Sequence, residues 1–289
     1  MMFIVDGTGE ESDQLYRKEM KGGFCKQLEK LCRGQYRRGP TLLGRETPDI
    51  AAAVVEDVLA WHRLPVKRNP RLFLAGHSRG GAAVIYAAQE LDKHGVQVDA
   101  MFLFDAVERS FEITRPLRSA KAIPPNVKCC YHALRETSLA FLYSDGALAA
   151  RDQVARLIGL PTGRRPSAIE DALDLAMKSP PRSGPVALAI QRALELEELD
   201  GRMKYVMRTM TMKTPSGWSL DFGNCGTEVD GACQLKKETF LGSHGALGGA
   251  PIIDSRAPKG LVESDRAAMA SVQAWMWSWL SAHGAFTNP

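Results

Sequence analysis

The chain has 289 residues, a length that suits one large domain or one domain with an insertion. With 45% hydrophobic and 24% charged residues, its composition is that of a soluble globular protein and argues against disorder. The net charge of +4 does not favour general nucleic-acid binding, and no apolar run approaches the roughly 20 residues that span a bilayer.

The amino terminus and the cysteines give further expectations. Residues 1–6 carry no basic leader, long apolar stretch or cleavage site, so we expect a cytoplasmic protein, or one exported without a signal peptide. The six cysteines do not form a disulfide framework. Cys225 and Cys233 flank a glycine-rich loop and could pair in an oxidising compartment, although we expect reduced thiols. No zinc-type ligand spacing is present, so we expect no metal.

The first elements are a strand, a basic stretch and a helix. Met2–Val5 reads as an apolar strand that ends at Asp6-Gly7-Thr8-Gly9, where two glycines permit a sharp loop. A basic helical stretch and a loop follow, as far as Gly44. We then expect a helix with Thr47 as its cap and Pro48 at its first position. Its buried face recurs at helical spacing, as Ile50, Val54, Val58 and Trp61.

The next elements alternate between strands and a helix. Arg71–Ala75 reads as a buried strand, Gly76–Gly81 as a tight turn and Ala82–Leu91 as an alanine-rich helix. Asp99–Phe104 and Val127–Tyr131 read as further apolar strands. This alternation predicts an α/β fold with a doubly wound, mostly parallel sheet.

The remainder of the chain breaks that rhythm. Helical, proline-punctuated sequence from approximately residue 145 to 202 predicts an insertion or lid within a single domain that covers residues 1–289. Tyr205–Met212 is strand-like, Leu241–Gly249 is a glycine-rich loop, and Ser264–Ser281 reads as a final helix. That helix carries Trp275, Trp277 and Trp279, which one helical face cannot all bury. We expect it to pack against the body of the protein, with membrane contact as the alternative.

The turn Gly76-His77-Ser78-Arg79-Gly80 has the form Gly-x-Ser-x-Gly. The pentapeptide alone is common, but here an apolar strand enters it and a helix rich in small residues leaves it. That setting is typical of a nucleophile elbow, which lifts a serine hydroxyl above the edge of a sheet. Ser78 is therefore the candidate nucleophile, and an incidental serine in a strand-to-helix turn is the alternative.

A serine needs a base that takes its proton and an acid that orients the base. Of the histidines after the elbow, His244 lies in a glycine-rich loop that suits a base. His132 follows a strand and suits a core or supporting position, and we expect His283 to be exposed near the end of the chain. His77 adjoins the nucleophile, and we expect its side chain to point elsewhere on the turn.

Asp105 is the candidate acid because it ends an apolar strand one strand after the elbow. Active sites of open α/β sheets form at the carboxyl ends of strands. An aspartate that caps the next segment is the alternative. Asp145, Asp221 and Asp230 are fallbacks, and Asp254 fits the chain order less well.

The oxyanion of an acyl-transfer intermediate needs backbone donors. We expect one from Arg79 at the start of the helix, and another from Gly7 or Thr8 in the first loop. Asp6 is a candidate substrate contact, as is His77, although Asp6 could instead brace the loop by hydrogen bonds.

Nine basic and two acidic residues lie between Arg17 and Arg45. A solvated surface is one interpretation. The other is a surface for an anionic substrate or membrane, with Arg33, Arg37 and Arg38 as candidate contacts.

Several motifs resemble, in order, those of the α/β-hydrolase family that includes phospholipase effectors of bacterial type VI secretion systems and uncharacterised relatives. The motifs are Asp6-Gly7-Thr8, Gly76 to Gly80 as Gly-x-Ser-Arg-Gly, Phe104-Asp105-Ala106-Val107, His132-Ala133-Leu134, and Gly242 to Gly249. The resemblance spans nearly the whole chain. It implies a triad of Ser78, Asp105 and His244, and ester hydrolysis, often on phospholipids.

The sequence thus predicts a carboxylic-ester hydrolase that needs no cofactor, with lipid or phospholipid as the favoured substrate. Gly245-Ala246-Leu247 stands where relatives often carry an acidic residue, so a small-ester hydrolase stays open. Thioesterase or amidase action stays open as well, and so does a non-catalytic binding protein on the same fold. Expected partners are the ester or lipid substrate, peripheral contact with an anionic membrane and, for an effector, a cognate immunity or secretion partner. We expect no nucleic acid.

Overall fold

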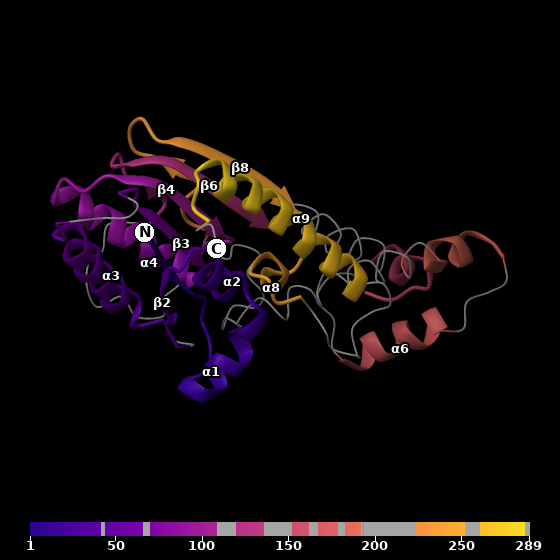
Figure 1. Cartoon of the computed structure of the whole chain (residues 1–289). Coiled ribbons are helices and arrows are strands. Elements are labelled where there is room, and N and C mark those ends of the chain that lie inside the picture. The colour runs from indigo at the N-terminus through magenta and orange to yellow at the C-terminus, as the bar shows by residue number, and fades with distance from the viewer. Residues whose placement is uncertain are drawn as a thin grey trace.

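The centre of the protein is a six-stranded sheet. The computed structural model describes residues 1–41, 44–65, 70–108, 120–135, 152–161, 167–178, 183–191, 193, 224–251 and 261–286. The strand order is β2-β1-β3-β4-β6-β8, and every neighbouring pair is parallel (Figure 1). In chain order the strands are β1 (Met2–Val5), β2 (Gln35–Arg37), β3 (Phe73–His77), β4 (Val98–Phe104), β6 (Val127–Arg135) and β8 (Gln234–Phe240). A separate two-stranded sheet pairs β5 (Ala122–Ile123) with β7 (Glu228–Val229).

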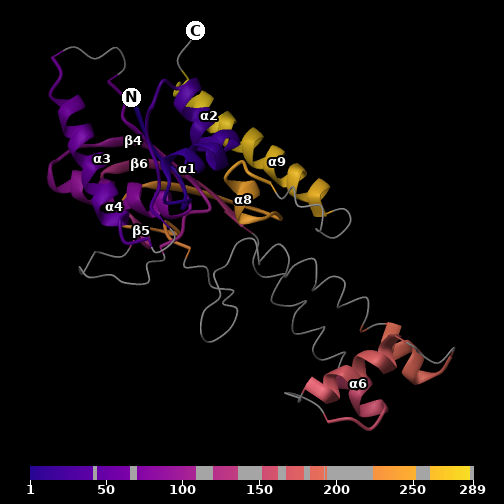
Figure 2. The ribbon, with the colours of Figure 1, turned by 90° about the horizontal axis from the view of Figure 1, so that it is seen from below.

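Helices cover both faces of the large sheet (Figures 1 and 2). Residues of α3 (Thr47–His62) and α4 (Arg79–Lys93) form a core with one face. Residues of α2 (Phe24–Leu31) and α9 (Leu261–Ala282) form a core with the other. The predicted doubly wound, mostly parallel α/β sheet of an α/β-hydrolase-like fold is therefore confirmed.

The two cores explain why the strands are apolar without alternation. Consecutive side chains of a strand point to opposite faces. On β4, Leu103 joins the core under α3 and α4, whereas Phe102 joins the core under α2 and α9. Both faces are covered, so both sets of side chains must be apolar.

Two strands and the elbow lie at positions that differ from the predicted ones. β3 lies at Phe73–His77, two residues later than predicted, and α4 begins at Arg79. The predicted turn of six residues is thus reduced to Ser78 alone. β6 continues to Arg135, which places His132 inside a strand.

The two edge strands were not predicted. β2 has only three residues, and β8 reads Gln-Leu-Lys-Lys-Glu-Thr-Phe with mostly exposed side chains. Charged side chains are typical of edge strands, where they discourage pairing with another chain. The strand-like segment Tyr205–Met212 lies outside the described residues.

The start of α3 differs from the prediction by one position. Glu46 is the N-cap residue, so Thr47 is the first helical residue and Pro48 the second. The Thr47 hydroxyl donates to the Gly44 carbonyl at 2.8 Å and does not accept from the helix. Thr47 as the cap was therefore wrong, since its side chain closes the preceding turn.

The described part of the predicted insertion is helical. It includes α6 (Ser167–Lys178) and residues 152–157 and 185–191. Val154, Leu173 and Ile190 belong to a small core of their own, and in both views these helices lie away from the sheet (Figures 1 and 2). The role of a lid stays a prediction.

Helix α9 packs on the body of the protein, as predicted. Trp275, Trp277 and Trp279 are each partly buried against Phe240, Phe24 and Tyr131, respectively. None of the described helices is long and apolar enough to cross a membrane.

His283, just after α9, is not the exposed residue that we expected. Its Nε2 lies 2.8 Å from the Tyr131 hydroxyl, and its ring contacts Phe73 and Phe102 edge-on. Burial lowers the pKa of His283.

Phe102 offers a test of this packing. Its side chain is fully buried, stacks on Tyr131 and contacts Phe73. Phe102→Ala should lower the free energy of unfolding by about 3–5 kcal/mol, because it removes buried apolar area and leaves a cavity. Urea unfolding measures this loss. Leu64→Ala, at a side chain of 52% exposure, is the control and should change it by less than about 0.5 kcal/mol.

Candidate active site

Ser78 lies in a strained turn between β3 and α4. Its φ of 56° and ψ of −130° are unusual for a residue with a side chain. A Cβ at Gly80 would collide with the backbone carbonyls of Val5 and Asp6, so only glycine lets α4 approach β1 this closely. The Ser78 carbonyl accepts from Gly81 at 2.9 Å. Close packing and hydrogen bonding thus hold the serine in the geometry of a nucleophile elbow.

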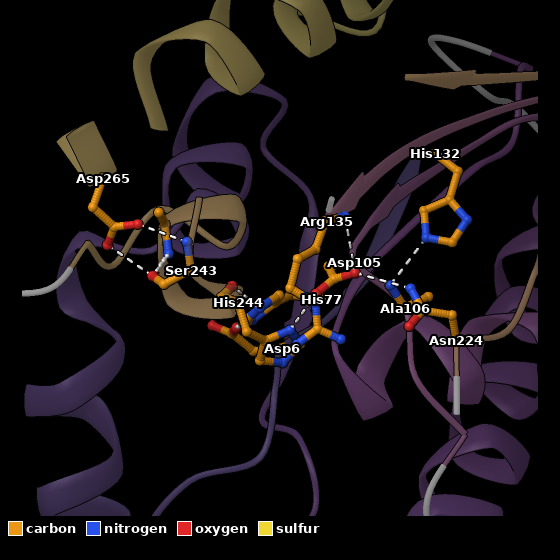
Figure 3. A network of polar contacts seen from close by, with 11 residues as sticks. Asp6, His77, Asp105, Ala106, His132, Arg135, Asn224, Ser243, His244 and Asp265 are labelled. Atoms are coloured by element: carbon orange, nitrogen blue, oxygen red, sulfur yellow. Dashed lines mark hydrogen bonds and ion pairs between the residues drawn. The ribbon is translucent and has the colours of Figure 1, made fainter. Parts of the chain in front are cut away.

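Asp105 and His244 are brought into contact from strand ends far apart in sequence. Asp105 follows β4, and His244 is the first residue of the short helix α8 (His244–Leu247). His244 Nδ1 lies 2.7 Å from Asp105 Oδ2 (Figure 3). The ring of His77, the residue before Ser78, has its centroid 4.8 Å from that of His244. The candidate base therefore lies beside the elbow and is hydrogen-bonded to the candidate acid.

Three further contacts stabilise the buried carboxylate of Asp105. Oδ1 accepts from Asn224 Nδ2 at 3.0 Å and from the backbone N–H of Arg135 at 3.3 Å. The side-chain Nε of Arg135 lies 3.4 Å from Oδ2. Burial alone would raise the pKa of Asp105, but the Arg135 guanidinium and the bond from His244 outweigh it. The pKa is therefore lowered, and the group stays a carboxylate.

Sequence reasoning missed both Arg135 and Asn224. The position of Arg135 at the end of a parallel strand is a signal that could have found it. Asn224 offers no such signal, because it approaches Asp105 through an isolated bridge to Val107.

Of the fallback acids, the structure describes only Asp230. Asp145, Asp221 and Asp254 lie outside the described residues, and Asp230 is exposed. Within the described part of the chain, no group of three or more His, Cys, Asp or Glu side chains is arranged to hold a metal. All six cysteines are free, and Cys225 and Cys233 are buried.

His77 is buried beside the candidate base. Its Nε2 lies 3.3 Å from the His244 carbonyl, and its Nδ1 lies 3.9 Å from Asp6 Oδ1. Burial, and then the charge of His244, lower the pKa of His77 to about 3, so the ring is neutral. The structure thus gives it contacts within the protein, and a substrate contact stays a prediction.

Asp6 braces the first loop. Its Oδ1 accepts from the Gly7 N–H at 2.8 Å and its Oδ2 from the Tyr36 hydroxyl at 2.9 Å. Burial raises the pKa of Asp6 to about 6, against the effect of these bonds. The Gly7 N–H is thus engaged by Asp6, and its role as an oxyanion donor stays a prediction.

Thr8 and Arg79, the other two candidate oxyanion donors, lie in the first loop and at the start of α4. The Thr8 N–H has no hydrogen-bond partner among the residues that the structure describes. Arg79 is the first residue of α4, and its Nη1 donates to Thr8 Oγ1 at 3.0 Å, which ties the loop to the elbow. Helix N-termini direct N–H groups outward, which suits Arg79, and the role of both residues as oxyanion donors stays a prediction.

The three arginines expected at a substrate surface have different surroundings. Arg37 is paired with Asp57, with Nη2 2.5 Å from Oδ2. Arg38 pairs with Asp13 and lies over the Tyr16 ring, 4.4 Å from its centroid. Of the three only Arg33 is exposed without a described partner, and a substrate contact of these arginines stays a prediction.

His132 supports the strand end that carries Asp105. Its Nδ1 donates to the Gly226 carbonyl at 3.1 Å, which leaves Nε2 to accept from the Ala106 N–H at 3.0 Å. Burial lowers the pKa of His132 to about 4. The predicted core position is confirmed, and both bonds require the neutral ring.

Comparisons with known proteins do not identify a family for the chain. No protein-family model matches the chain, and no curated protein matches its sequence. Among solved structures, the type II thioesterase YbtT of the yersiniabactin pathway is 14% identical, with a TM-score of 0.33 over 99% of this chain and 94% of that one. The thioesterase RedJ of prodiginine biosynthesis in Streptomyces coelicolor is 15% identical, with a TM-score of 0.31 over 95% and 89%.

A lipase gives a similar result. The monoacylglycerol lipase of Paleococcus ferrophilus is 15% identical, with a TM-score of 0.25 over 94% of both chains. Likenesses at this level support no inference of activity. The function of the chain must therefore be inferred from the geometry around Ser78 and Asp105.

His132 gives a prediction about stability and pH. Its folded-state pKa of about 4 lies below the value of about 6.5 in an unfolded chain, so the unfolded state binds more protons between these values. Stability should therefore fall as pH drops through 6.5, and the loss should be complete near pH 4. Relative to His132→Gln, the wild type should lose about 3 kcal/mol between pH 7 and 4. Urea unfolding at several pH values measures this difference, and a pH-independent difference would contradict the prediction.

Proposed function

We propose that the protein is a serine hydrolase that cleaves carboxylic esters through Ser78, His244 and Asp105. The observation that carries the proposal is the 2.7 Å contact between His244 and the buried Asp105, beside a serine held at a φ of 56°. Chain order in the sequence selects the same three residues. A serine in a strained elbow, next to an imidazole oriented by a carboxylate, is suited to acyl transfer.

The first step is acylation of the serine. Ser78 Oγ attacks the ester carbonyl, and His244 takes the hydroxyl proton at Nε2. Asp105 accepts from Nδ1–H, which selects the tautomer with a free Nε2 and stabilises the imidazolium. The negative charge on the carbonyl oxygen is stabilised by the N–H groups of Thr8 and Arg79.

The second step releases the acyl group. The tetrahedral intermediate collapses, the C–O bond to the alcohol breaks, and His244 returns its proton to the leaving oxygen. A water molecule then gives its proton to His244 and attacks the acyl carbon, which frees the acid and restores Ser78. These steps need no cofactor.

A lipid or phospholipid is the substrate class that we favour. The support is the resemblance of the motifs to a phospholipase family, together with basic side chains near the first loop. Arg17 and Lys18 are exposed on α1 (Asp13–Glu19), and Lys21 is exposed on the following turn η1 (Met20–Gly22). Short-chain esters and thioesters are the competing substrate classes that a substrate panel separates.

Ser78→Ala and His244→Ala should each lower kcat by at least three orders of magnitude, because the nucleophile and the base act as one unit. Asp105→Asn should lower it by about four, because the amide favours the wrong tautomer of the imidazole. Turnover of a phospholipid, a short-chain ester and a thioester measures both effects and ranks the substrates. His94→Ala, at an exposed histidine, is the control and should stay fully active.

Labelling by a fluorophosphonate probe provides an independent measurement. The wild type should be labelled at Ser78 and the Ser78→Ala variant should not. If the wild type is neither labelled nor active on any of the three substrates, the fold serves a non-catalytic binding protein instead.

The substrate surface can be tested with charge pairs. Arg17→Ser with Lys21→Ser should weaken binding to phosphatidylglycerol vesicles by roughly 30-fold at low salt, since each basic residue near an anionic bilayer contributes about 1 kcal/mol. Lys30→Ser with Arg33→Ser is the matched control, because it removes the same exposed charge. These two residues precede β2, so they lie toward the end of the sheet opposite to the first loop. Vesicle sedimentation measures both. Equal losses in the two pairs would show that charge in general, and not this face, attracts the membrane.

A further inference from the structure

A buried carboxylate on α9 holds the segment that precedes the candidate base. Asp265 is 1% exposed, and both of its oxygens contact Ser243. Oδ1 accepts from the Ser243 N–H at 2.6 Å, and Oδ2 accepts from the Ser243 hydroxyl at 2.7 Å (Figure 3). A charge removed from water needs such partners, so this contact is a strong constraint on the position of Ser243.

Ser243 in turn sets the start of α8. It is the N-cap residue, and its Oγ accepts from the Ala246 N–H at 3.0 Å. Since one lone pair of Oγ takes that bond, the hydroxyl hydrogen points to Asp265. The next residue is His244, so the cap fixes the backbone from which the imidazole projects toward Asp105.

Other contacts hold α8 and the residue before Ser243 against the helices of the body. At its far end, the Phe24 N–H of α2 donates to the Gly248 carbonyl at 2.8 Å. At its near end, a Cβ at Gly242 would lie 2.5 Å from the Ala268 side chain of α9, so only glycine lets the segment lie this close to that helix. The turn that carries His244 is therefore fixed at both ends by helices of the body.

We propose that Asp265 is a positioning residue for catalysis: through Ser243 it fixes α8 and thereby the distance between His244 and Asp105. This inference rests on the proposed function, in which His244 is the base. In this proposal Asp265 acts by positioning the imidazole of His244 and is not itself a reacting group.

A carboxylate is required at this position because both contacts need an acceptor. An asparagine offers only one acceptor oxygen. If that oxygen keeps the bond from the Ser243 N–H, the amide nitrogen faces Oγ, so the Ser243 hydroxyl hydrogen loses its acceptor and must turn away. The cap then moves, and His244 moves with it. A displacement of about 1 Å at a catalytic group costs up to about a hundredfold in rate.

The experiment measures kcat and KM on a soluble short-chain ester, or on whichever substrate of the panel is turned over. Asp265→Asn should lower kcat by 10- to 100-fold and change KM by less than twofold. Glu263→Gln, at an exposed acid on the same helix, is the matched control and should match the wild type. Met276→Ala, at a fully buried side chain of α9, controls for stability and should keep kcat at a temperature well below its Tm.

A double variant separates positioning from a general structural role. In the His244→Ala background no base remains to be positioned, so adding Asp265→Asn should change the residual rate by less than twofold. Ser243→Thr keeps the hydroxyl and should retain most activity, whereas Ser243→Ala should lose kcat in the same way as Asp265→Asn. This pair also serves as the test if Asp265→Asn does not fold.

Three outcomes would overturn the inference: an unchanged kcat in a folded Asp265→Asn variant, an equal kcat loss in Met276→Ala, or a full Asp265 effect in the His244→Ala background. Each of these leaves the proposed function standing, provided that His244→Ala alone is inactive. Activity of Ser78→Ala would instead refute the proposed function itself, and the inference with it.

Discussion

A carboxylate buried under the end of a sheet keeps its charge only where the protein replaces the water that it has lost. Asp105 meets this requirement with partners from three different parts of the chain, His244, Arg135 and Asn224. The arrangement of the site follows from this one charge. The strand that carries Arg135 must extend far enough, and α8 must reach across the sheet, for the carboxylate to be satisfied.

The parallel sheet makes this convergence geometrically simple. Because all strands of the large sheet run in the same direction, their carboxyl ends share one edge, and the residues after β1, β3, β4 and β8 meet there. The chain passes from β1 outward to β2 and returns to β3 on the other side, so the strand order reverses between β1 and β3. Open α/β sheets bind their ligands at such a point. The first loop and Ser78 follow the two strands that flank it.

Much of this architecture could be predicted, because buried parallel strands leave continuous apolar runs and the elbow has a recognisable setting. Asp105 and His244 followed from chain order. The edge strand β8 was missed because its lysines and glutamate hide the strand pattern, and β2 was too short to detect.

The contacts around the site that the sequence did not predict have a common cause. Arg37 and Arg38 were expected at a substrate surface because the sequence shows which residues are charged but not where their side chains point. The structure pairs both arginines with acids. The contacts of Asn224 and Asp265 join segments that are more than a hundred and more than twenty residues apart, respectively. Such pairings depend on tertiary packing, which no local pattern encodes.

The anchoring of the segment before His244 to α9 has a consequence for synthesis of the protein. A chain leaves the ribosome from its amino terminus, so the elbow and Asp105 emerge well before α8 and the helix that anchors it. Contacts between such distant segments cost more loop-closure entropy than local contacts, so they form slowly. If His244 is the base that we propose, a nascent chain carries Ser78 without it, and the catalytic arrangement is complete only after α9 has docked.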